Sequence, residues 1–385
     1  MKRTIHIGLL GRIVLAIALG IAAGSWLPAP AARLFATFNA LFGEFLGFAI
    51  PLIILGLVTV AIADIGKQAG RLLLITVAIA YGATLLSGFI AYFTGAALFP
   101  RMITPGLLPL QAAAEVTLTP YFQVSIPPLM GVMTALVLSF VLGLGMAHLQ
   151  GTALKNGAAE FRLVITGVIT RLIIPLLPLY IFGIFLSMAY TGQVYAVLGV
   201  FIRIILVIFG IHLFVLLLQY ALAGAIVRRN PLGLLLRMMP AYFTALGTQS
   251  SAATIPVTLA QTLKNGVSQR IAGFVIPLCA TIHLSGSTLK IVACALALML
   301  MQGMPYSFAQ FAGFICLLGI TMVAAPGVPG GAIMASLGVL QSVLGFGEAQ
   351  QALMIALYIA MDSFGTACNV TGDGAIALVM DKITR

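Results

Sequence analysis

The sequence predicts an all-α membrane protein with eight transmembrane helices and two re-entrant helical hairpins. Of its 385 residues, 62% are hydrophobic and only 7% are charged, whereas an ordinary soluble domain has about 25% charged residues. Several apolar stretches exceed about 18 residues, the length that crosses a hydrocarbon core about 30 Å thick. Two further apolar stretches are interrupted by small and hydroxylated residues, and these interruptions predict the hairpins.

Six apolar segments come first, and each is long enough to span a bilayer. They cover residues 5–27, 38–63, 72–99, 128–147, 163–190 and 195–227. The basic start and the small residues that follow the first segment also fit a cleaved signal peptide. Because the first apolar stretch is long enough to span, we expect a retained helix instead.

The next two apolar segments, 233–260 and 307–344, are broken by GTQSSAATIP at 247–256 and by PGVPGG at 326–331. Lipid offers no partner to unpaired backbone N–H and C=O groups, so non-helical backbone at membrane depth must lie inside the protein. Each broken segment is followed by an apolar segment that carries polar residues, 271–302 and then 350–380. This order indicates an internal repeat whose breaks share one site.

Charge placement supports this arrangement. With a cytoplasmic N-terminus and hairpins that enter and leave by one face, 13 basic residues fall inside and only Arg33 and Arg101 fall outside, as the positive-inside rule requires. We therefore expect a multi-pass protein of a bacterial inner (cytoplasmic) membrane with both termini cytoplasmic. The net charge of +11 is spread over the ends of apolar runs, which indicates membrane orientation and no nucleic-acid partner.

The last apolar segment carries a polar face. Asp362, Thr366, Asn369 and Asp373 are spaced i, i+4, i+7 and i+11, so they lie along one side of a helix. A carboxylate near the bilayer centre costs at least about 2.5 kcal/mol, so two of them call for a cation, an ammonium group or a proton. Lys290 is a candidate partner within the chain.

The breaks supply further candidates. Gln249, Ser250 and Ser251 offer hydroxyls and freed backbone N–H groups that suit a substrate carboxylate, although small residues also serve close helix packing. The stretch CATIHLSGS at 279–287 suits an unwound segment whose carbonyls ligate an alkali cation. The four cysteines show no C-x-x-C spacing, so we expect neither a disulfide framework nor a zinc site, and no cofactor.

Taken together, these residues make the chain resemble the dicarboxylate/amino acid:cation symporter family, which includes the bacterial glutamate/aspartate transporter homologues. Three pieces carry the likeness: QSSAATIPVT at 249–258, GVPG at 327–330 and DSFGTACNVTGD at 362–373. The resemblance implies the elevator fold of that family, in a homotrimer. Residues 1–232 would form mainly the scaffold, with the third and sixth helices moving with a transport core at 233–385.

The resemblance also implies roles for individual residues. Asp362 would bind a substrate ammonium, and Asn369 and Ser251 a substrate carboxylate. The substrate-binding positions would be Gln249, Ser250, Ser251, Ser287, Gly327, Val328, Pro329, Asp362, Gly365, Thr366 and Asn369. The cation-binding positions would be Cys279, Thr281, His283, Asn369 and Asp373, with Na⁺ as the coupled ion and no other metal. We add His283 and Lys290 as candidates to carry a proton or a substitute charge.

Two departures from the family pattern and one further resemblance narrow the expected function. Acidic-substrate members have an arginine where this chain has Gly365, so a glutamate or aspartate carrier is disfavoured unless an arginine from elsewhere reaches in. The stretch DSFGTACN at 362–369 also resembles the serine/threonine:sodium symporter branch. The stretch HLSGS at 283–287 replaces the family motif NMDGT, and the lost carboxylate lowers the expected number of coupled ions.

We therefore expect a secondary active symporter that couples uptake of a small amino acid, neutral or polar, to a cation gradient, with Na⁺ as the first expectation. The alternatives are H⁺ coupling, a dicarboxylate or acidic amino acid cargo on the same fold, a substrate-gated channel and an inactive relative. No H-E-x-x-H motif or Ser-His dyad is evident, so an enzyme is not expected.

Overall fold

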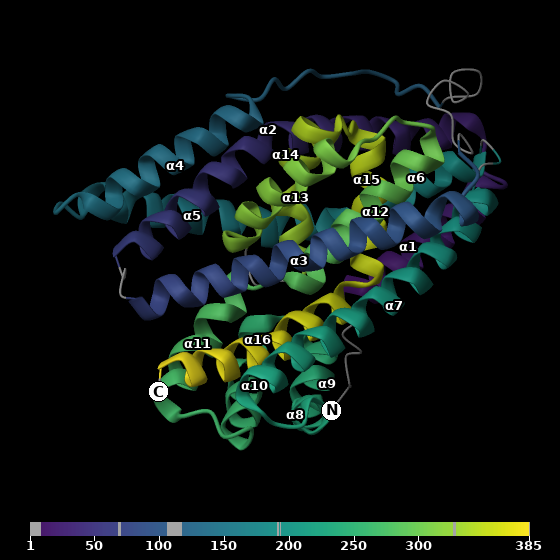
Figure 1. Ribbon diagram of the computed structural model, residues 1–385. Helices are drawn as coiled ribbons and strands as arrows, with labels where there is room; N and C mark the ends of the chain where they lie inside the picture. The colour runs from purple at the N-terminus through teal and green to yellow at the C-terminus, as the bar shows by residue number, and fades with distance from the viewer. Residues whose placement is uncertain are drawn as a thin grey trace, which may run out of the picture.

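The computed structural model describes residues 9–67, 71–105, 118–190, 192, 194–325 and 329–384. Within these ranges every regular element is helical (Figure 1), so the predicted all-α class is confirmed. The elements are α1 (Leu9–Gly24), α2 (Ala29–Lys67), α3 (Arg71–Met102), α4 (Val132–His148), α5 (Ala153–Val168), the π-helical segment η2 (Ile169–Ile173), α6 (Ile174–Tyr190), α7 (Val194–Val227), α8 (Pro231–Arg237), α9 (Met239–Thr248), α10 (Ser251–Lys264), α11 (Gln269–Ile282), α12 (Ser285–Gln302), α13 (Phe308–Val323), α14 (Gly331–Leu344), α15 (Glu348–Ala360) and α16 (Asp362–Thr384).

The apolar segments at the start of the chain form helices α1 to α7, as predicted. Among the described residues, five helical stretches are long and apolar enough to cross a membrane, and a sixth is added if the bent pair α15–α16 counts as one span. A multi-pass membrane protein follows from these lengths. The count of eight crossings with two re-entrant hairpins stays a prediction.

The helices form two packing groups. In the first, α2 packs against α4, α5 and α6, and α1 packs along α6. In the second, α3 packs along α12 and α13, while α7, α9, α10 and α11 pack around α16. Figure 1 shows α3 running across the front, with α12 to α15 on one side of it and α16 with α8 to α10 on the other.

The centre of the molecule is formed by the last third of the chain. Every residue of α12 from Ser285 to Met301 is buried, and most of α14, α15 and α16 is buried as well. The α12 half of the apolar span 269–302 is therefore enclosed by protein on all sides. A span so enclosed can carry polar groups that lipid would not tolerate.

The predicted helix breaks are present. The first hairpin consists of α9 and α10, which pack together and are separated only at residues 249–250. The second consists of α13 and α14, and part of its tip, 326–328, lies outside the described residues. The chain is also unwound between α11 and α12, at His283 and Leu284, where the sequence predicts a cation-ligating stretch.

The last segment differs from the expected single helix. It is two helices, α15 and α16, bent by 63° at a break of one residue, Met361. The Met361 N–H bonds to the carbonyl of Tyr358, three residues back, so the α-helical pattern of bonds to the fourth residue back is interrupted. As a result Asp362 is the first residue of α16 and lies at its positive end.

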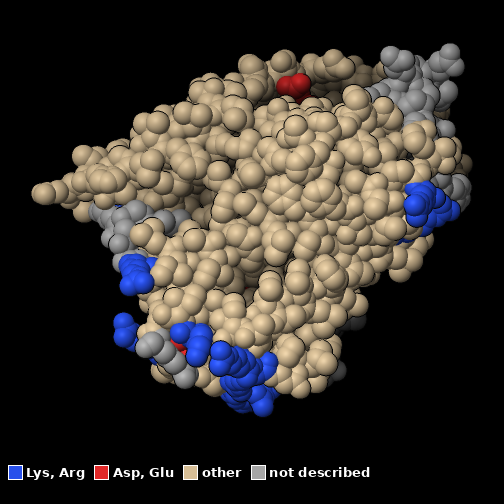
Figure 2. All heavy atoms as spheres, viewed as in Figure 1, with Lys and Arg blue, Asp and Glu red and all other residues tan. Residues whose placement is uncertain are grey.

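Basic side chains gather at one end of the molecule. Figure 2 shows Lys and Arg grouped at the end that holds α8, α10 and the C-terminal end of α16, while most of the visible surface beyond it is uncharged. The exposed basic residues of these elements and their flanking turns are Arg228, Arg229, Arg237, Lys264, Arg270 and Lys382. All of them belong to the set that the sequence predicts to face the cytoplasm.

Candidate functional site

The tips of both hairpins meet the first two residues of α16. At the first tip, Gln249 Nε2 donates a hydrogen bond of 2.9 Å to Ser363 Oγ. At the second, the backbone N–H of Gly330 donates a bond of 2.8 Å to Asp362 Oδ2. The two hairpin tips, which are about 80 residues apart in the sequence, thus both contact the start of α16.

Local chemistry shapes the first tip. Gln249 has φ 53° in the left-handed region, which lets the chain turn between α9 and α10. Ser250 is the N-cap of α10, and its hydroxyl accepts the Ala253 N–H at 3.3 Å. Ser251, the first residue of α10, is buried. Among the three predicted tip residues, Gln249 makes the hydrogen bond to α16 described above.

The second tip reaches the site through its backbone. Gly327 and Val328, both predicted substrate-binding residues, lie outside the described residues. Pro329 is partly buried and precedes Gly330, whose φ of 75° is readily adopted only by glycine. That conformation directs the Gly330 N–H to Asp362 and starts α14 at the next residue.

Asp362 forms a buried ion pair with Lys290 of α12. Lys290 Nζ lies 3.4 Å from Asp362 Oδ1 and 3.2 Å from the carbonyl oxygen of Met361. The same ammonium stands 3.8 Å from the centre of the Tyr358 ring, a favourable cation–π distance. Lys290 is 1% exposed and Asp362 4%, so the pair is shielded from water.

Gly365 provides the space for this lysine. A Cβ atom on Gly365 would overlap Cε and Nζ of Lys290. A Cβ on Gly286 would overlap the carbonyl oxygen of Gly365 and lie 2.6 Å from Cys368 Cβ, so α12 and α16 touch through their backbones. From the sequence, no charged partner is expected at Gly365, whereas the structure brings a cation from α12 to that position.

Asn369, Ser287 and Thr366 are engaged within the protein. Asn369 Oδ1 accepts the Gly286 N–H at 2.8 Å and its Nδ2 donates to Ser287 Oγ at 3.2 Å, which caps the start of α12. Tyr358 OH also donates to Ser287 Oγ, at 3.0 Å. The Thr366 hydroxyl bonds to the carbonyl of its own helix four residues back, at 3.0 Å. In this conformation Asn369, Ser287 and Tyr358 link α12, α15 and α16.

The second carboxylate of the polar face pairs with an imidazole. His283 Nδ1 lies 2.9 Å from Asp373 Oδ1, and both residues are about 1% exposed. His283 is also the C-cap of α11: its N–H makes the last helical bond, to the carbonyl of Cys279 at 2.9 Å, and its own backbone is extended. The imidazole thus contacts Asp373, the carboxylate that the family resemblance assigns to cation binding. Thr281 is exposed and bonds to Leu278, so the structure does not bring it to this pair.

Gln219 of α7 completes this part of the site. A Cβ on Gly372 would lie 2.6 Å from both Gln219 Oε1 and His283 Cε1, so the two side chains flank that glycine. Gln219 Nε2 donates to Ser285 Oγ at 3.2 Å. Within the described residues, Gln219 Oε1 and His283 Nε2 have no hydrogen-bond partner. An amide oxygen and a ring nitrogen are thus available for hydrogen bonds beside the His283–Asp373 pair.

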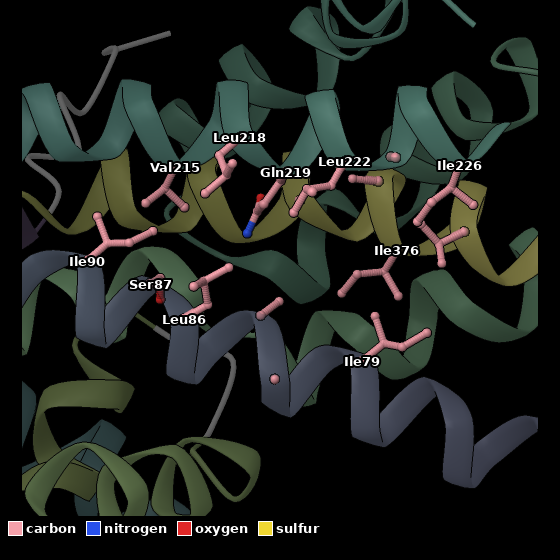
Figure 3. Close-up of a pocket in the computed structure, with 16 residues that line it drawn as sticks. Ile79, Leu86, Ser87, Ile90, Val215, Leu218, Gln219, Leu222, Ile226 and Ile376 are labelled. Carbon is pink, nitrogen blue, oxygen red and sulfur yellow. The ribbon is translucent and has the colours of Figure 1, made fainter. Parts of the chain in front are cut away.

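An apolar crevice of about 290 Å³ opens beside Gln219, between α3, α7 and α16. Figure 3 shows Gln219 and Ser87 as polar groups among aliphatic side chains such as Leu86 and Leu222. Ser87 Oγ donates to the carbonyl of Ser285 at 2.9 Å. Gln219 was not among the predicted site residues, although an amide in a mostly apolar span is a signal for a polar site.

The sequence profile described as the sodium:dicarboxylate symporter family matches residues 9–383. This chain belongs to that family. The resemblance seen in the motifs is therefore confirmed, and the fold described above is that of a sodium:dicarboxylate symporter family member. The proteins of this family are transporters, so the expectation that the chain is not an enzyme agrees with its membership.

The family member also matches mammalian transporters over part of its length. It is 33% identical to excitatory amino acid transporter 3 of Mus musculus over 161 residues, which are 42% of this chain and 31% of that protein. It is 32% identical to excitatory amino acid transporter 5 of Homo sapiens over 42% of this chain and 29% of that protein. The match thus spans less than a third of the length of these curated relatives.

Proposed function

We propose that this family member is a secondary active symporter that couples uptake of a small carboxylate-bearing solute to a cation gradient. The observation that carries this proposal is the meeting of both hairpin tips with Asp362 and Ser363. A solute bound there would be covered by both tips. The helices α10, α14 and α16 also begin near this point, and their positive ends favour an anionic group.

The cargo expected from the sequence is a small neutral or polar amino acid. Gly365 supports it, because this position has no side chain to pair with an acidic substrate. One observation favours a second candidate, a carboxylic acid or acidic amino acid: the Lys290 ammonium lies against Gly365 and supplies a positive charge there.

The coupled ion that we propose first is Na⁺, in keeping with the family. Asp373, Asn369 and the backbone carbonyl of Cys279 would be its ligands. H⁺ is the alternative, and the contact of 2.9 Å between His283 and Asp373 supports it, since an imidazole on that carboxylate can carry a proton.

We further propose an inner-membrane homotrimer with both termini cytoplasmic and an elevator movement of residues 233–385. The basic end of the molecule in Figure 2 supports this orientation. The packing of α3 on α12 and of α7 on α16 supports the movement of these two helices with the transport core, while α2 packs with α4, α5 and α6 in the manner of a scaffold.

A thermal-shift screen tests the proposal. The purified protein in detergent is heated with small amino acids and carboxylic acids, in NaCl or in choline chloride. A ligand at 100 times its Kd stabilises the folded state by about 2.7 kcal/mol, so a true cargo raises the melting temperature. The stabilising compound is then tested for uptake into proteoliposomes. Failure of every compound to stabilise the protein and to exchange across the membrane would refute the proposal.

A further inference from the structure

Lys290 is the single fully buried Lys or Arg among the residues that the structure describes. A buried ammonium is costly unless it is paired and hydrogen-bonded. Its three N–H groups have three partners: Asp362 Oδ1, the Met361 carbonyl and the face of Tyr358. The ammonium is therefore held at one place in the site, as a bound cation would be.

Both carboxylate oxygens of Asp362 are in turn engaged. Oδ1 faces the Lys290 ammonium and Oδ2 accepts the Gly330 N–H. An ammonium group on a solute would find both oxygens of Asp362 already engaged and the negative charge offset by Lys290. It would also stand beside the positive charge of Lys290 and be repelled by it.

Gly365 and Lys290 fit each other. The space at Gly365 in which a side chain would begin is filled by Cε and Nζ of Lys290. Absence of a side chain at one position of α16 thus permits a cation from α12 to reach Asp362. Gly365 and Lys290 together determine which cation pairs with the Asp362 carboxylate.

We propose that Lys290 is a built-in ammonium that occupies Asp362 and selects cargo with a carboxylate but no α-amino group. The inference rests on the proposed function and chooses between its candidate cargoes. A hydroxyl in place of the amino group is neutral, so it escapes the repulsion and can hydrogen-bond to the same surroundings. Lys290 acts as a specificity-determining residue of the site.

Three matched pairs of compounds isolate this property, because each pair shares a carbon skeleton and differs only in hydroxyl against ammonium. They are glycerate with serine, lactate with alanine, and malate with aspartate. Binding to the full chain in detergent with Na⁺ is measured by thermal shift over a concentration series. For the pair that binds, we expect the wild-type protein to bind the hydroxy acid at least tenfold tighter than the amino acid.

The variant Lys290→Met frees Asp362 for an external ammonium. We expect it to bind the amino acid of that pair at least tenfold tighter than the wild-type protein does. Gly365→Ala is a second variant, which keeps the lysine but places a Cβ where the ammonium lies and so displaces it from Asp362. It should shift the preference toward the amino acid as well. The matched control is Lys264→Met, an exposed lysine at the end of α10, which should leave both affinities unchanged.

Two outcomes overturn the inference, and they differ in what they say of the proposed function. A wild-type protein that prefers the amino acid, with the preference unchanged in Lys290→Met and Gly365→Ala, refutes the role of Lys290 and leaves the symporter intact. Absence of binding by all of the compounds, in the wild-type protein and in both variants, refutes the proposed function and this inference together.

Discussion

Removal of either partner of the buried Lys290–Asp362 pair should destabilise the protein much more than removal of both. The charges are 3.4 Å apart, which corresponds to an attraction of about 5 kcal/mol at an effective dielectric constant of about 20. Loss of one partner of a buried pair costs about 3–5 kcal/mol, while replacement of both is often neutral. We expect Lys290→Met and Asp362→Asn each to lower the free energy of unfolding by an amount near that range. The double variant should lower it by much less than the sum of the two single effects.

The assay is a double-mutant cycle on the detergent-solubilised protein, with unfolding followed by circular dichroism in graded denaturant. The coupling free energy between positions 290 and 362 should reach about 3 kcal/mol, above the 0.5 kcal/mol expected of independent sites. Lys290→Met combined with Asp381→Asn is the matched control, because Asp381 lies at the other end of α16 and accepts the Ser268 N–H. Additive effects at 290 and 362 would refute the ion pair as described.

Three further outcomes follow from the site. His283→Asn removes the imidazole from Asp373, so uptake should saturate at a lower Na⁺ concentration; an unchanged Na⁺ dependence measured in proteoliposomes would contradict this. Gly286→Ala forces a Cβ into a backbone carbonyl of α16, so it should lower the free energy of unfolding by about 1–3 kcal/mol or more. Gly273→Ala, which has open space around it, should leave that free energy unchanged. Gln249→Ala breaks the bond between the first tip and α16, so the Kd for cargo should rise severalfold while the yield of folded protein stays the same; an unchanged Kd would argue against that contact.

Much of this architecture is predictable from sequence because its signals are local. Apolar length gives the spanning helices, and Gly, Ser and Pro within apolar runs mark the breaks between α9 and α10 and between α13 and α14. The spacing of Asp362 and Asp373 places both on one face of a helix, and both are buried in α16. These inferences need only the geometry of one helix and the polarity of its surroundings.

Other features of the site depend on how helices pack, which local patterns do not determine. The sequence puts Lys290 on the same face as His283, but only the contact between α12 and α16 shows that it reaches Asp362 across Gly365. No Gly or Pro lies next to Met361, so the sequence does not predict the bend there. Thr281 shares the unwound stretch with His283 yet points to the exterior, because helix rotation decides which side chains face the core.

In the proposed transport cycle, a cation gradient moves a solute bound beside Asp362, beneath both hairpin tips, against the solute's own gradient. Concentrative uptake of the stabilising compound into proteoliposomes, under an inward Na⁺ or H⁺ gradient, tests it most directly. We expect the compound to accumulate above its external concentration, and this accumulation to collapse when an ionophore dissipates the gradient. We expect Asp362→Asn to abolish the accumulation. Equilibration at the same rate with or without a gradient, unaffected by Asp362→Asn, would contradict it.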